Sequence, residues 1–314
     1  MTATIFTLAH LSDPHLPIPL ALPRPLRRLA GKRLLAYLSW RRKRHAVHSS
    51  HVLEALLSDL AAHAPDHMAI TGDLTNLALP EEFIAARDWL ARLGAPGRVT
   101  VVPGNHDATV PVPWPRGQGL WEPWMRGDED RPDGHRFPFL RRCGPVALLG
   151  LSSAVATPPF SAAGRLGRGQ VARLRQALDD LGGQGLFRVV LVHHPPVAGE
   201  GGWRKALRDR AALCAALREA GAELVLHGHH HVSRLVSLPG PLGPIPVIGL
   251  PPALSCIAAP EVARWHLHRI TREAPAGGGW SLSTEARAYD PATAAFRTAG
   301  QWTLRLGGLN SGAE

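Results

Sequence analysis

The sequence predicts an α/β protein, and three observations support that prediction. Short runs of apolar residues alternate with longer stretches in which apolar residues recur at helical spacing. Asp, Asn or His follows most of these runs at once, as is typical of the carboxyl edge of an α/β sheet. With 314 residues and 45% hydrophobic content, the chain can form one large α/β domain or two small ones.

The expected strands and helices alternate along most of the chain. Buried strands, each ending at a Gly, Pro or polar break, are expected over residues 4–11, 67–71, 99–102, 146–151, 187–192 and 223–226. Helices are expected over residues 49–62, 80–93, 168–181 and 203–220. The second of these begins at Pro80, and the last ends before Gly221. After Val232 the helical pattern stops, and short strands are expected over residues 246–250, 262–270, 280–289 and 301–306.

The net charge of +10 is concentrated in one insertion, residues 18–48. No acidic residue lies between His15 and Glu54, and nine cations do: Arg24, Arg27, Arg28, Lys32, Arg33, Arg41, Arg42, Lys43 and Arg44. After a proline-rich start, residues 26–44 have the spacing of an amphipathic helix. Three interpretations stay open: a solvated surface helix, a peripheral membrane contact through residues 24–44, and a nucleic-acid contact. Leu and Trp between the arginines favour membrane over nucleic acid.

A second insertion, residues 111–145, is rich in Trp and Pro and has no periodicity. A loop of this length inside a compact domain is usually functional or disordered. Trp114, Trp121 and Trp124 could form a lid that stacks on a base or packs on an acyl chain, or they could anchor the loop to the body. The sequence supports both interpretations equally.

Cysteine usage and hydropathy indicate the compartment. Cys143, Cys214 and Cys256 are odd in number and far apart, which argues against a disulfide framework and favours a reducing, cytoplasmic environment. Neither a signal-type leader nor an apolar stretch of about 18 residues is present. We expect a cytoplasmic protein, peripheral to the inner face of the membrane if residues 24–44 contact lipid.

The polar residues that follow the strands are of metal-binding types. They are Asp13, His15, Asp73, Asn105, His193, His229 and His231. Carboxylate, imidazole and amide donors suit Mn, Fe, Zn or Co. Seven donors are too many for one tetrahedral zinc, but they suit two metals that share a carboxylate. Such a pair can stabilise both oxygens of an in-line displacement at phosphorus.

These segments resemble the motifs of the calcineurin-like metallophosphoesterase superfamily. All five motifs occur in family order between Leu8 and about His231: Asp13-Pro14-His15, Gly72-Asp73, Gly104-Asn105-His106-Asp107, His193 in His-His-Pro-Pro, and Gly228-His229-His230-His231. The resemblance implies a four-layer α/β/β/α sandwich with two mixed sheets, the second completed by the strands after Val232. We expect one domain over residues 1–270 and a C-terminal β extension of it, residues 271–314, that caps the site or contacts a second copy.

The resemblance also assigns roles. Asp13, His15 and His231 would bind the first metal, and Asp73 would bridge to the second. Asn105, His193 and His229 would bind the second. His106 would contact the phosphate and protonate the leaving oxygen, held by Asp107. Among the other histidines, His194 would support the ligands, and His230 would line the pocket or face solvent. Structural or solvated positions are expected for His10, His227, His45, His48 and His51.

The finer resemblance is to the class III cyclic-nucleotide phosphodiesterase branch, through Leu-Ser-Asp-Pro-His-Leu, Gly-Asp-Leu-Thr and His-His-Pro-Pro. It implies a phosphodiesterase for cyclic nucleotides or other small diesters, with two metals (Mn or Fe first, then Zn or Co) and a metal-bridging hydroxide as nucleophile. An alternative is a membrane-surface hydrolase of a lipid-linked phosphodiester or pyrophosphate such as UDP-diacylglucosamine, although that group carries Arg where this chain has His106. A third reading is a binding module without turnover, and the intact motifs argue against it.

Overall fold

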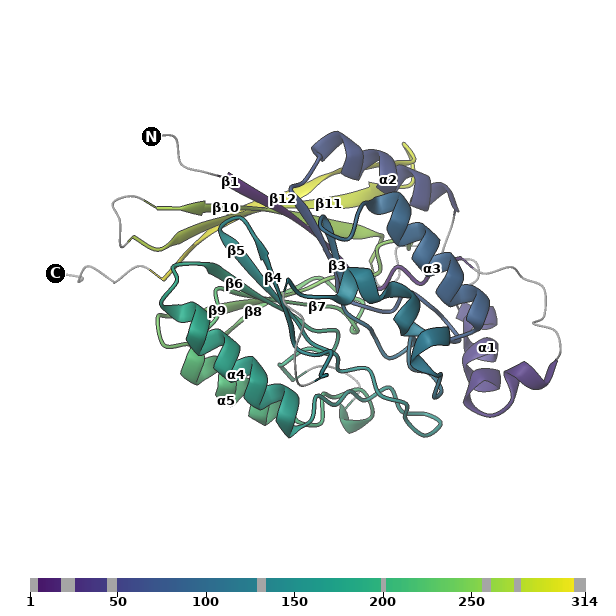
Figure 1. Ribbon diagram of the computed structural model, residues 1–314. Coiled ribbons are helices and arrows are strands. Elements are labelled where there is room, and N and C mark those ends of the chain that lie inside the picture. The colour runs from purple at the N-terminus through teal and green to yellow at the C-terminus, as the bar shows by residue number, and fades with distance from the viewer. Residues whose placement is uncertain are drawn as a thin grey trace.

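The computed structural model describes residues 5–17, 26–43, 50–128, 134–198, 202–255, 261–273 and 278–307. Within these residues, two mixed sheets of six strands face each other and helices cover both outer faces (Figure 1), so the predicted α/β/β/α fold is confirmed. The expectations for His45, His48, Cys256 and the proline-rich part of the basic insertion lie outside the described residues.

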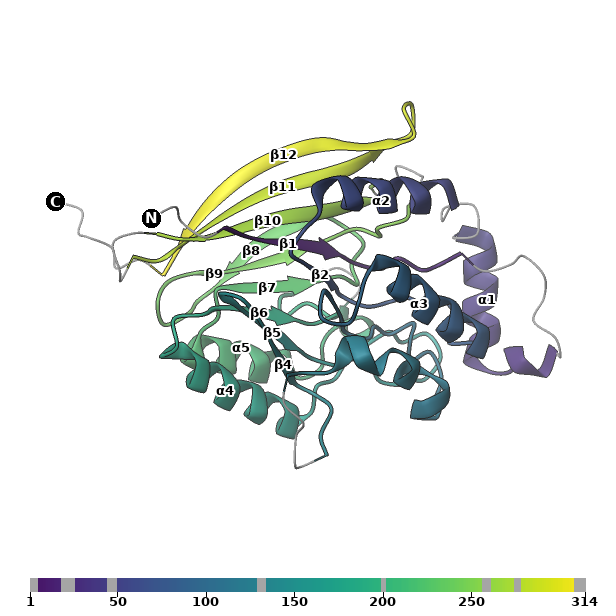
Figure 2. The ribbon, with the colours of Figure 1, turned by 45° about the horizontal axis from the view of Figure 1, so that its top comes forward.

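The first sheet has the strand order β12-β11-β10-β1-β2-β3. Strands β1 (Ile5–Leu11), β2 (His67–Ile70) and β3 (Val99–Val101) run parallel, because helices connect them. On the other side of β1 the sheet continues antiparallel through β10 (Arg264–Arg272), β11 (Trp280–Asp290) and β12 (Ala295–Leu306), as Figure 2 shows.

The second sheet has the order β4-β5-β6-β7-β9-β8. Its parallel centre consists of β5 (Val146–Gly150), β6 (Phe187–Leu191), β7 (Leu224–His227) and β9 (Ile245–Gly249). All residues of these four strands are buried, as expected for parallel strands covered on both faces. The antiparallel edges are β4 (Phe139–Cys143) and β8 (Arg234–Leu238).

The helices pair with the sheets. Helices α2 (Ser50–His63) and α3 (Pro80–Leu93) cover the first sheet, and α4 (Arg168–Gly182) and α5 (Arg210–Ala220) cover the second (Figure 1). Helix α1 (Lys32–Lys43) lies beside α3 and packs through Tyr37 and Trp40 on Leu77 and Leu79, which follow β2. Four short 3₁₀ helices complete the described elements: η1 (Leu26–Leu29), η2 (Trp114–Arg116), η3 (Gln118–Met125) and η4 (Gly202–Arg204).

Two expected helices are interrupted. A continuous helix over residues 26–44 is wrong, because Gly31 adopts a φ of 66° between η1 and α1. A continuous helix over residues 203–220 is also wrong: η4 is followed by a non-helical turn, and α5 begins only at Arg210. Residues 111–145, which lack periodicity, contain η2, η3 and the edge strand β4.

The strands after Val232 do not all complete one sheet. Strands β8 and β9 join the second sheet, whereas β10, β11 and β12 extend the first. The described residues of the expected C-terminal extension therefore belong to the same sheet as β1. Whether this extension caps the site or contacts a second copy stays a prediction.

The apolar layer between the sheets contains buried histidines. His10 lies opposite His266 in the β1–β10 register, and His268 is the next residue of β10 on the same face. His268 Nδ1 lies 2.9 Å from the Thr284 hydroxyl, and burial lowers the pKa of His268 to about 3. Burial also holds the pKa of His10 well below its ordinary value, as do His268, His266 and, on the second sheet, His227. The folded protein keeps these imidazoles neutral.

Acid should therefore destabilise the protein in part through His268. The unfolded chain protonates this residue as the pH falls through about 6.5, whereas the folded protein protonates it only near 3. Between those values the unfolded state holds one extra proton, so stability falls by up to about 1.4 kcal/mol per pH unit. His268→Leu should remove this part of the pH dependence of the free energy of unfolding, measured in urea between about pH 4 and 6.

Thr284→Val is the matched control, because it removes the hydroxyl partner and keeps the imidazole. Its slope should equal that of the wild type. Identical slopes in all three proteins would show that His268 is not buried as a neutral ring.

Candidate metal centre

The predicted site residues lie together at one edge of the molecule, where the carboxyl ends of strands from both sheets meet. The first sheet supplies residues after β1, β2 and β3, and the second supplies residues after β6 and β7. Short contacts between side chains or backbone groups join nine residues: Asp13, His15, Asp73, Asn105, His106, Asp107, His193, His229 and His231.

Five of these residues have an uncommon backbone conformation. Their φ angles are positive, between 40° and 73°, although none is glycine: Asp13, His15, Asp73, His229 and His231. A non-glycine residue in this region costs of order 1–3 kcal/mol, and such residues cluster at functional sites. The turns after β1, β2 and β7 therefore aim these side chains at a cost to local stability.

One group of donors consists of Asp13, His15, Asp73 and His231, whose ligand atoms lie within 4.8 Å of one another. His231 Nε2 is 3.1 Å from Asp13 Oδ1 and 3.5 Å from His15 Nε2. His15 Nε2 is 3.7 Å from Asp73 Oδ2. Two imidazole nitrogens and two carboxylates that face a common point suit a divalent cation.

A second group lies on the other side of Asp73. The Oδ1 atom of Asn105 is 3.1 Å from His193 Nε2 and 2.8 Å from His229 Nδ1. His193 Nε2 is also 3.4 Å from Asp73 Oδ2, the same oxygen that faces His15. One carboxylate oxygen is therefore common to both groups.

The imidazole rings are oriented as metal ligands usually are. The nitrogen turned away from the centre pairs with a backbone carbonyl in three of them: His15 with Thr75 (3.2 Å), His193 with Thr71 (2.7 Å) and His229 with Lys205 (2.9 Å). Because a carbonyl only accepts, that nitrogen carries the proton and the other presents its lone pair. The donor set and its tautomers fit a pair of cations bridged by Asp73.

His194 lies beside His193 and His229 but is not free to bind. Its Nε2 donates to the Ala162 carbonyl, and its Nδ1 lies 2.7 Å from the Ser153 hydroxyl. Burial lowers the pKa of His194 to about 3, so the ring is neutral and both nitrogens are occupied. This supporting position agrees with the preference for His193 as the ligand.

Without a cation, the centre pairs charges internally. Burial alone would raise the pKa of Asp73, but His193 and His106 hold it well below its ordinary value. Burial lowers the pKa of His193, but Asp73 and Asp13 outweigh it and raise the value to about 9. The site is thus built to hold positive charge next to Asp73.

The Asp107 carboxylate is surrounded by backbone N–H groups. It accepts hydrogen bonds from the backbone N–H groups of Asp73 (3.0 Å), Thr75 (2.9 Å) and Gly104 (2.9 Å) and from the Thr75 hydroxyl. The Nδ1 atom of His106 pairs instead with the Asn76 carbonyl at 2.8 Å. Asp107 therefore joins the turns after β2 and β3, and Asn76 orients His106.

Other supporting residues carry little sequence signal. Glu82 accepts from the N–H groups of Asn76, Leu77 and Leu79, so the first turn of α3 holds the segment that orients His106. The position of Glu82, two residues after Pro80, indicates the start of a helix, but it does not indicate the hydrogen bonds to Asn76, Leu77 and Leu79. Gly104 and Gly228 leave no room for a Cβ, which would collide with Asp73 and Asp13 respectively. The Lys205 carbonyl that orients His229 has no sequence signal.

The tryptophans of the second insertion anchor it to the body. Trp121 is fully buried and donates to the Phe83 carbonyl, and Trp124 donates to the Gly94 carbonyl. Trp114 is half-buried near Glu122. Of the two interpretations, the structure favours anchoring for Trp121 and Trp124.

Comparisons with known proteins agree with this geometry. A family model for calcineurin-like phosphoesterases matches residues 6–233. A dimetal phosphatase from Danio rerio has a similar fold, with a TM-score of 0.58 and 12% identity over 96% of this chain and 98% of that chain. A sulfate thiohydrolase from Thermus thermophilus is more distant, with a TM-score of 0.43 and 18% identity over 96% of this chain and 56% of its own. At 12% identity, the likeness to the Danio rerio phosphatase is one of fold alone. No curated protein sequence matches.

Asp107→Ala should weaken both the fold and metal uptake. It leaves three buried N–H groups without their acceptor, so the free energy of unfolding should fall by at least about 3 kcal/mol. The turns after β2 and β3 would loosen, and metal content after dialysis against Mn²⁺ should fall. Asp88→Ala, which removes an exposed carboxylate paired with Arg87, should change stability by less than about 1 kcal/mol. Wild-type stability and metal content in Asp107→Ala would contradict this role.

Proposed function

The chain belongs to the calcineurin-like phosphoesterase family, whose model covers residues 6–233, and we propose that it hydrolyses a small phosphodiester such as a cyclic nucleotide. The observation that carries the proposal is the shared oxygen: Asp73 Oδ2 lies 3.7 Å from His15 Nε2 and 3.4 Å from His193 Nε2. A carboxylate placed between two donor groups is the arrangement that a pair of metal ions requires.

The donor set divides between two cations. Asp13, His15 and His231 would hold the first together with Asp73. Asn105, His193 and His229 would hold the second with the same carboxylate. Bound there, two such cations supply Lewis acidity toward phosphoryl oxygens and activate water at neutral pH. Mixed sets of imidazole nitrogens with carboxylate and amide oxygens suit Mn or Fe, with Zn or Co as further candidates.

His106 is the proposed proton donor. Its ring packs edge to face against His15 with 4.8 Å between centroids, next to the first donor group. Its backbone N–H donates to Asp73 Oδ1 at 2.7 Å, and its Nδ1 faces the Asn76 carbonyl at 2.8 Å. When the ring is doubly protonated, Nδ1–H stays on this carbonyl and Nε2–H can pass its proton to the alkoxide oxygen as the P–O bond breaks. An alkoxide is a poor leaving group, so hydrolysis of an alkyl diester gains more from this proton than hydrolysis of a p-nitrophenyl ester does.

Two substitutions should separate metal binding from proton transfer. Asp73→Asn should abolish turnover of bis-p-nitrophenyl phosphate and lower metal content, because the bridging charge is lost. His106→Ala should reduce turnover of an alkyl diester such as 3′,5′-cyclic AMP by about 10²–10⁴-fold, with metal content near that of the wild type. Metal analysis and initial rates on Mn²⁺-loaded protein measure both.

Parallel loss of metal in His106→Ala would show that this residue is a ligand. The substrate class is tested by comparing bis-p-nitrophenyl phosphate, 3′,5′- and 2′,3′-cyclic AMP and glycerophosphodiesters with the monoester p-nitrophenyl phosphate. A monoester preferred over every diester would overturn the diesterase proposal and leave the phosphoesterase family intact.

A second candidate is a membrane-surface hydrolase of a lipid-linked phosphodiester or pyrophosphate. Helix α1 buries Tyr37 and Trp40 but exposes Leu34, Leu35 and Leu38, which are 36–46% exposed within the basic insertion. Lys32 binds Thr157 and the Ser161 carbonyl, and this places the loop with Phe160, which is 75% exposed, beside the start of α1. None of the described helices is long and apolar enough to cross a bilayer. Exposed leucines among cations favour a peripheral contact with anionic lipid.

Leu34→Glu/Leu38→Glu tests this candidate without disturbing the buried side of α1. The double variant should lose co-sedimentation with vesicles containing phosphatidylglycerol, because two charges replace apolar surface. Leu242→Glu, a change at a leucine 63% exposed between β8 and β9, is the control and should sediment as the wild type does. If the double variant sediments like the wild type, the membrane candidate fails.

A further inference from the structure

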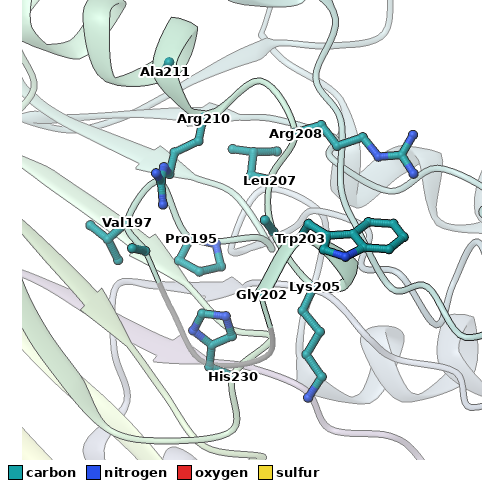
Figure 3. A pocket seen from close by; sticks show the side chains of 12 residues that line it. Pro195, Val197, Gly202, Trp203, Lys205, Leu207, Arg208, Arg210, Ala211 and His230 are labelled. Carbon is teal, nitrogen blue, oxygen red and sulfur yellow. The ribbon is translucent and has the colours of Figure 1, made fainter.

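A cavity of about 640 Å³ opens beside the metal centre, in the connection between β6 and α5 (Figure 3). Its volume is in the range of sites for small organic ligands. Pro195, which follows the candidate ligand His193 by two residues, forms one wall, and His230, between His229 and His231, forms another. Two of the residues that line the cavity are therefore close in sequence to candidate metal ligands.

The cavity is cationic. Lys205, Arg208 and Arg210 line it, and among its described lining residues none is acidic. The Asp209 carboxylate, which lies between two of these cations in sequence, instead accepts from the N–H groups of Leu166 and Gly167. The amino-terminal end of α5 adds its partial positive charge at Arg210 and Ala211. The field in the cavity therefore favours an anion.

Figure 3 shows how these side chains are disposed. Arg210 and His230 lie on opposite sides of a wall formed by Pro195 and Val197. The exposed indole of Trp203 adds an apolar face, which suits an organic part of a ligand.

One residue connects the cavity to the centre. The Lys205 backbone carbonyl accepts from His229 Nε2 at 2.9 Å, while the Lys205 side chain lines the cavity. The other nitrogen of His229 faces Asn105 Oδ1 at 2.8 Å. The cavity therefore borders the backbone segment that orients a candidate metal ligand.

We propose that this cavity is a substrate subsite for a second anionic group, so that the preferred phosphodiester carries a phosphate-type anion besides the scissile one. The inference rests on the proposed function and extends it to a substrate class. Lys205 and Arg210 supply the charge, and Trp203 and Val197 contact the organic part that joins the two anions. Neutral-substituent diesters such as bis-p-nitrophenyl phosphate leave the subsite unused.

The test uses two substrates with the same scissile bond. Thymidine 5′-(p-nitrophenyl phosphate) and its 3′-phosphorylated analogue both release p-nitrophenol when water attacks the 5′ phosphorus and the aryl P–O bond breaks. On Mn²⁺-loaded full-length protein, the 3′-phosphate should lower KM on the order of tenfold, and the gain should shrink as salt is raised. Lys205→Gln/Arg210→Gln should remove the difference in KM between the two substrates.

The control is Arg218→Gln, which removes one positive charge at the exposed far end of α5 and should keep the preference. If both substrates are turned over with the same KM, the inference is overturned while the proposed function stands. If neither is turned over, the proposed function fails for these esters, and calorimetric titration with thymidine 3′,5′-bisphosphate and thymidine 5′-monophosphate decides the inference. Tighter binding of the bisphosphate that Lys205→Gln/Arg210→Gln abolishes supports it, and equal binding overturns it.

Discussion

The structure depends on one buried carboxylate. Asp73 is 1% exposed, and a charge so placed is costly unless every lone pair is matched. Its Oδ1 accepts from the His106 backbone, its Oδ2 faces His15 and His193, and its own N–H is held by Asp107. These partners come from both sheets and are up to 120 residues away in sequence, so the carboxylate is satisfied only when the two sheets face each other in the observed register.

The sequence predicts the location of the site well, but it predicts poorly which hydrogen bonds orient the site residues. Strand ends can be recognised because an apolar run followed within a few residues by Asp or Asn marks the carboxyl edge, and Asp13, Asp73 and Asn105 all follow this rule. The backbone contacts of Asp107 carry no sequence signal, because the N–H groups that its carboxylate accepts from belong to turns after two different strands. Strands β8 to β12 share one pattern, so sequence alone does not show that the last three cross to the first sheet.

The basic insertion, too, has a structural function that composition hides. Arg33 donates to the carbonyls of Leu77 and Ala78, and Tyr37 and Trp40 pack on Leu77 and Leu79. Those carbonyls immediately follow Asn76, whose own carbonyl orients His106. Part of the charge thus supports the turn after β2, which orients the proposed proton donor. Removing the whole insertion would disturb the centre as well as any membrane contact, so only its exposed leucines report on lipid binding alone.

If the proposed subsite binds substrate, the same coupling extends to substrate choice. In a fold whose metal edge is shared by many activities, the loops decide what is bound, and here the connection between β6 and α5 both lines the cavity and orients His229. The Lys205 backbone fixes the tautomer of His229, while its side chain charges the neighbouring cavity. Insertions or deletions in such a loop are poorly tolerated, because a shift of the Lys205 backbone would misorient the candidate metal ligand His229. Its side chains can change without that penalty, and specificity can therefore be retuned at Lys205 and Arg210 while the catalytic geometry is kept.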